Sequence, residues 1–132
     1  MSRKVATLLA LLAFLGLGFR LFGDGPELKK KAGEFDVGMR MDRNPPIRGD
    51  NAIEISVRDA AGGAVDDVKI LVNYYMPPMP RMVPMNYRVE AKLKKDLYRA
   101  KMTFIMEGPW IIAVKITHDE KTVTAKFNID VR

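Results

Sequence analysis

Most of the chain alternates between apolar and polar residues, and this period of two limits what it can fold into more than any other feature. In the stretch AIEISVRD, isoleucine and valine alternate with Glu54, Ser56 and Arg58. Successive side chains of a strand point to opposite faces, so such a stretch offers one apolar face to a core. Seven stretches share the pattern: EFDVGMRM, AIEISVRD, DVKILVNYY, NYRVEAKL, LYRAKMTFIM, PWIIAVKIT and TVTAKFNIDV.

Turn-forming residues separate these stretches, as in NPPIRGDN, AAGGAVD and HDEK. Seven short strands within residues 34–132, each with one apolar face, predict an all-β domain. Its expected class is an antiparallel β-sandwich of immunoglobulin-like type. The inward positions predict a core that includes Ile55, Val72, Val89, Phe104, Val114 and Phe127.

The composition excludes several kinds of site. The chain has no cysteine and a single histidine, His118, which excludes disulfides, thiolate chemistry and ordinary zinc sites. The formal net charge is +6, but the basic residues alternate with apolar ones as on a solvated sheet face. We therefore expect no nucleic-acid partner, since such a surface normally combines a basic stripe with stacking aromatic residues.

The first 22 residues, MSRKVATLLALLAFLGLGFRLF, predict export. A short basic head precedes a charge-free run from Val5 to Phe19, the pattern of a secretory signal. Extended to Phe22, the run has 18 residues and reaches the length of a short membrane span. Residues 1–22 are therefore either a signal peptide or a signal anchor, followed by a charged linker over 23–33 and the domain over 34–132. The expected location is the periplasm, or a membrane with the domain facing the periplasm or the outside.

One segment departs from ordinary composition: NYYMPPMPRMVPMNY, residues 73–87. Methionine recurs there at every third position, and four of the eight prolines lie between the methionines. Polyproline II is the backbone form with three residues per turn, and in it the methionines would lie about 9 Å apart along one stripe. Two sulfurs at that distance cannot share an ion, so either the segment bends back or each methionine finds partners elsewhere. The four methionines are Met76, Met79, Met82 and Met85.

The order of the strands predicts which residues share an end of the sandwich. We call residues 73–87 the Met-Pro segment. If consecutive strands are antiparallel, this segment lies at the same end as Met41, Met106 and Trp110. His118 falls at the opposite end. Sulfur and one indole therefore gather at one end, without an imidazole.

Thioethers are soft, neutral ligands that favour Cu(I), or Ag(I), over zinc, calcium or magnesium. They need no deprotonation, and an aromatic face can add cation–π attraction to a monovalent ion. The segment therefore predicts a Cu(I) site formed by its four methionines, without an organic cofactor. Met41 and Met106 are additional candidates, and Trp110 is expected beside the ligands.

Two alternatives remain open. Methionine also fills irregular gaps, so the segment could be a hydrophobic lid, or a metal-free module that docks onto a membrane protein complex. Met39 and Met102 are expected to be core residues. We expect no enzyme, because no serine is placed to pair with His118 and the carboxylates are scattered over outward faces and turns.

Three stretches, MPPMPRMVPM, MEGPWIIAVKI and the C-terminal TAKFNIDV, resemble the YtkA-like/FixH-like family of small exported β-sandwich domains over about residues 34–131. That family is associated with bacterial membranes and periplasms. It includes anchored proteins linked to the biogenesis of copper-containing cytochrome oxidases and domains found with heavy-metal efflux adaptors. The resemblance implies that Met76, Met79, Met82 and Met85 carry the function. It also implies a metal-efflux or oxidase-assembly protein as the partner.

Overall fold

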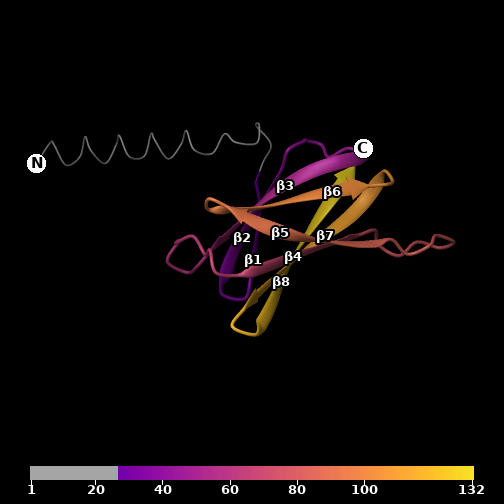
Figure 1. Cartoon of the computed structure of the whole chain (residues 1–132). Helices are drawn as coiled ribbons and strands as arrows, with labels where there is room; N and C mark the ends of the chain where they lie inside the picture. The colour runs from indigo at the N-terminus through magenta and orange to yellow at the C-terminus, as the bar shows by residue number, and fades with distance from the viewer. Residues whose placement is uncertain (1–26) are drawn as a thin grey trace, which may run out of the picture.

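The computed structural model describes residues 27–132, which form eight strands and no helix. Figure 1 shows how the strands are arranged, and their buried apolar side chains form a single core. The strands are β1 (Leu28–Ala32), β2 (Phe35–Met41), β3 (Gly49–Arg58), β4 (Lys69–Tyr75), β5 (Asn86–Lys94), β6 (Leu97–Phe104), β7 (Gly108–His118) and β8 (Lys121–Val131).

Every strand pairs with its neighbours in antiparallel fashion, in the order β1-β2-β3-β6-β5-β4-β7-β8. The two outer strands, β1 and β8, contact each other, so the two layers close almost into a barrel. The predicted fold class, an all-β antiparallel sandwich, is confirmed. It has one strand more than the seven that the sequence predicted.

Strand β5 belongs to both layers. Its residues 86–91 pair with β4, whereas only residues 92–94 pair with β6. From Ala91 back to Asn86, β5 is therefore no longer paired with β6, and the two strands separate toward the end that carries the Met-Pro segment. The backbone amide of Thr103 on β6 donates across this gap to the Tyr74 hydroxyl on β4, at 3.4 Å.

The alternation defines the core correctly at most positions. Ile55, Val72, Phe104, Val114 and Phe127 are buried, as predicted. Val89 is only half-buried, because it lies on the part of β5 that has left β6.

The additional strand, β1, comes from a segment expected to be part of the charged linker. It pairs with β2 along its whole length, from Leu28 opposite Met39 to Ala32 opposite Phe35. Its three lysines are exposed and only Ala32 is buried, so no apolar alternation marks it in the sequence. The expected signal or anchor segment, residues 1–22, lies outside the described residues. Within residues 27–132, no helix could span a membrane.

The two ends of the sandwich carry different connections. The loops β2–β3, β4–β5 and β6–β7 lie at one end, together with the end of β8, and we call this the methionine end. Two backbone hydrogen bonds tie the C-terminal residue to the β2–β3 loop there, from Arg132 to the Pro46 carbonyl and from Arg48 to the Arg132 carbonyl. The turns β1–β2, β5–β6 and β7–β8 lie at the other end with His118, together with the longer β3–β4 connection over residues 59–68. We call this the histidine end.

Candidate metal site in the methionine loop

The ten residues 76–85 connect β4 to β5 and form the methionine loop. The loop reverses direction at Pro80 and Arg81, where the Met82 amide donates to the Met79 carbonyl at 3.3 Å. Proline at the second position and a φ of 65° at Arg81 in the third fit a type II turn. The loop therefore bends back on itself, which is one of the two options that its period of three left open.

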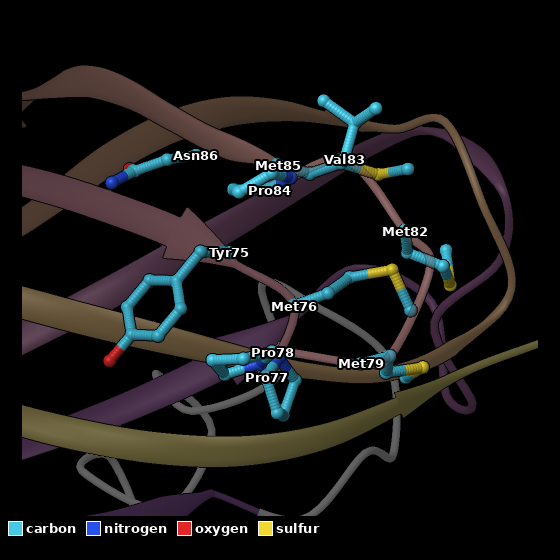
Figure 2. Close-up of a pocket in the computed structure, with 10 residues that line it drawn as sticks. All are labelled: Tyr75, Met76, Pro77, Pro78, Met79, Met82, Val83, Pro84, Met85 and Asn86. Carbon is cyan, nitrogen blue, oxygen red and sulfur yellow. The ribbon is translucent and has the colours of Figure 1, made fainter.

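The spacing of three has a structural counterpart in this reversal. Counted outward from the turn, Met79 matches Met82, and Met76 matches Met85. The same count continues into the strands, where Tyr75 pairs with Asn86. Each arm of the loop therefore carries two thioethers at equivalent positions, and Figure 2 shows both arms around one hollow.

All four loop methionines line this hollow, together with prolines of both arms. Met76 is the deepest, at 9% exposed, while the other three are half-buried. Met76 is seated against Gly108, where an added Cβ would lie 3.2 Å from the Met76 Cε. None of the lining residues is charged, so thioether sulfurs are the soft donors that the hollow offers.

An aromatic cluster supports the loop from below. Tyr74 and Tyr87 flank the loop at its base and stack at 5.4 Å between ring centroids. Trp110 contacts both rings and meets Phe104 edge-on at 5.2 Å. Trp110 is 1% exposed and does not line the hollow, so it supports the loop rather than facing a ligand there. Its indole N–H donates to the Met106 carbonyl at 2.9 Å, which fixes the β6–β7 loop beside the cluster.

Sequence reasoning did not single out Tyr74, Tyr87 or Gly108. The signal was present for all three. The two tyrosines stand two residues outside the first and last loop methionines, and Gly108 begins the GPW motif.

The two additional candidate ligands lie apart from the loop. Met41 is half-buried and lines a different hollow with Leu28, Pro46 and Arg132. Met106 is 37% exposed and does not line the methionine hollow. The structure thus gathers four sulfurs around one hollow rather than six. Met39 and Met102 are fully buried core residues.

His118 lies at the histidine end. Its Nε2 is 3.3 Å from an Asp67 carboxylate oxygen, and its ring meets Phe35 edge-on at 5.9 Å. Within residues 27–132, no three His, Asp or Glu side chains are close enough to hold a metal ion.

Comparison with known families agrees with this fold. The sequence model of the YtkA-like family matches residues 29–115, more than half of the chain. The chain belongs to the YtkA-like family. The match begins in β1, includes the whole methionine loop and ends in β7.

A solved structure similar to this YtkA-like domain is the PmoD soluble domain from Methylocystis sp. ATCC 49242 (Rockwell). It aligns with a TM-score of 0.59 and 14% sequence identity, covering 80% of this chain and 97% of that one. At that identity the likeness shows a shared fold. A search of curated protein sequences finds no match to this YtkA-like chain.

Proposed function

We propose that this YtkA-like domain binds or delivers Cu(I) on the outer side of a membrane, through the four loop methionines. Such a domain would serve copper handling, metal efflux or cytochrome oxidase biogenesis. The observation that carries the proposal is the gathering of two thioethers from each arm of the loop around one uncharged hollow. A generic hydrophobic lid needs no such matching of sulfur on both arms.

The donor set fits Cu(I) and disfavours other metals. Thioethers are soft and carry no charge, which suits a monovalent soft ion rather than zinc, calcium or magnesium. Met79, Met82 and Met85 are half-buried and so can exchange an ion with a partner. Met76 is buried against Gly108 and would hold its sulfur at the floor of the hollow.

The docking module stays the second candidate, on a separate observation. Four apolar side chains at the methionine end are unusually exposed: Val83 at 79%, Ile105 at 52%, Leu28 at 38% and Met106 at 37%. Exposed apolar residues grouped at one end are typical of protein–protein contact. A metal-free module would use this surface and need no sulfur.

An anaerobic titration separates the two functions. The soluble domain, residues 26–132, is titrated with Cu(I) against a chromogenic competing chelator and then with Zn(II). We expect retention of Cu(I) and no comparable affinity for Zn(II). The affinity should change little between about pH 5 and 7.5, because thioethers do not titrate whereas histidine does near 6.5.

Variants locate the ligands. Changing all four loop methionines to leucine keeps apolar bulk and removes sulfur, so it should abolish Cu(I) retention. The matched control changes Met39 and Met102 to leucine, which removes sulfur from the core alone and should leave retention intact. His118→Ala should also retain Cu(I). Equal retention by the wild type and the four-leucine variant would remove the loop as the ligand source, and no retention by either would favour the docking module.

A further inference from the structure

The chain enters the domain at the same end that carries the methionine loop. Strand β1 runs away from that end, because Leu28 at its start pairs with Met39, close to the end of β2. Leu28 also shares a hollow with Pro46 and Arg132, which belong to the methionine end. The start of β1 and the methionine loop therefore lie at the same end of the sandwich, although they line separate hollows.

This entrance to the domain is held in place. The Glu27 carboxylate forms an ion pair with Arg40 of β2 at 3.6 Å. It lies directly over Gly38, where any Cβ would collide with it. The chain is therefore fastened to the sheet from Glu27 onward, and only the residues before Glu27 can act as a tether.

The tether is short compared with the domain. Phe22 and Leu28 are six residues apart, so they are separated by at most about 20 Å. Strand β8 has 11 residues and spans about 35 Å between the two ends. If residues 1–22 stay in a membrane, the tether cannot reach around the domain, and the histidine end cannot take the place of the methionine end at the membrane.

We infer that the methionine end faces the membrane to which the chain is anchored, and that its partner is the outward face of a membrane-embedded protein. The inference rests on the proposed function and on retention of residues 1–22 as an anchor. The loop would then exchange copper within the layer just above the bilayer. Freely diffusing acceptors would meet mainly the opposite end.

The surface chemistry favours a protein over lipid as the occupant. Exposed charges of both signs lie in the loops of the methionine end: Arg43 and Arg81 are basic, and Asp42 and Glu107 are acidic. Binding to an anionic lipid surface would instead require a cluster of basic residues. Exposed Val83 and Ile105 among mixed charges fit the apolar centre and polar rim of a protein contact.

The orientation can be measured without any metal, so a failure of copper binding would not affect the result. Because the chain has no cysteine, single cysteines introduced as Val83→Cys or Lys121→Cys take one nitroxide label each. The full chain is reconstituted in liposomes, and the accessibility of each label to a nickel chelate fixed on lipid headgroups is compared with its accessibility to oxygen. We expect strong headgroup contact at position 83 and little at position 121.

Each control has a defined outcome. Inserting about twenty glycine and serine residues between Gly25 and Pro26 should remove the difference between the two labels, because the domain can then turn over. Equal contact at both positions without the insertion would overturn the inference, as would a mature chain that lacks residues 1–22. If the label at position 83 were as accessible to oxygen as a label among the acyl chains, the loop would be inserted into lipid. That result would overturn the inference that the partner is a protein.

A second measurement tests the partner class. The acceptor probe is a synthetic transmembrane peptide that carries two methionines just outside the bilayer, compared with the same methionine segment as a soluble peptide. Copper-loaded full-length chain should transfer Cu(I) faster to the membrane-bound probe, and the tether insertion should reduce that advantage. Equal transfer rates to both probes would overturn the partner assignment.

Discussion

The two ends of the sandwich are built on the same strands but are closed in opposite ways. At the histidine end, β7 and β8 are joined by Asp119 and Glu120 alone, both with positive φ, and β3 and β4 are joined by the ten residues 59–68. Most residues of both connections are exposed. At the methionine end, the ten-residue loop is apolar apart from the exposed Arg81, and it rests on an aromatic cluster. The ends therefore differ in the burial of their connections and not in length, because a ten-residue connection occurs at each end. The proposed contact with a ligand or partner would use this apolar, supported loop at the methionine end.

The largest expected difference between the ends concerns stability. Trp110→Ala removes the centre of the aromatic cluster and should lower the free energy of unfolding by about 3–5 kcal/mol. His118→Ala at the other end should lower it by less than about 1 kcal/mol, since the ring is partly exposed. Urea unfolding followed by far-UV circular dichroism measures both. Trp110→Phe is the control that retains an aromatic ring, and similar losses for the two alanine variants would break the comparison.

A smaller effect tests the seat of Met76. Gly108 has a φ of 120°, so Gly108→Ala should cost about 1–3 kcal/mol in backbone strain, and its methyl group would also press on Met76. Gly49→Ala is the matched control, because φ there is 103° and no atom lies within 4 Å of the added Cβ. We expect the larger loss at Gly108, measured by thermal unfolding.

A double-mutant cycle isolates this contact. Shortening Met76 to alanine in the Gly108→Ala background should recover the part of the loss that comes from their contact. Equal losses at Gly49 and Gly108, without coupling to Met76, would show that Gly108 does not seat the methionine.

The smallest effect is expected at the histidine end. Glu120 has a φ of 67°, which glycine adopts without the strain that a side chain adds. Glycine also gives the unfolded chain more conformational freedom, which offsets part of this gain. Glu120→Gly should therefore stabilise the domain by a net of about 0.5 kcal/mol. The variant should bind Cu(I) as the wild type does. Chemical denaturation and the chelator titration test these two expectations, and a changed Cu(I) affinity would show that the two ends are coupled.

The sequence was most informative where burial on one face decides the structure. Residues 53–57 alternate between apolar and polar in the sequence and form the middle of β3, where Glu54 on the polar side is nevertheless buried and pairs with Arg99 at 3.0 Å. The sequence did not predict β1, because that strand has three exposed lysines and no apolar face. Pairing with β2 alone makes it a strand. Val89 is more exposed than its pattern indicated, because it lies on the part of β5 that is no longer paired with β6. This separation depends on how the whole sheet is arranged, so the local sequence does not reveal it.

For the site, the spacing of the methionines identified the residues that line the hollow but not how they meet. The meeting depends on a turn at Pro80 and Arg81, and arginine is not the residue expected at a position with positive φ. Strand direction placed Met41 and Met106 at the correct end. That end is wide, however, so sharing it does not bring two side chains into one hollow.

The prolines of the methionine loop have a consequence for entropy. A flexible ten-residue loop loses conformational freedom when a ligand orders it, and that loss weakens binding. Here four of the ten loop residues have φ fixed by a proline ring, and a hydrogen-bonded turn fixes the tip. Most of the freedom is therefore lost when the domain folds and not when a ligand arrives. A preorganised loop of this kind can use nearly all of its contact energy for affinity.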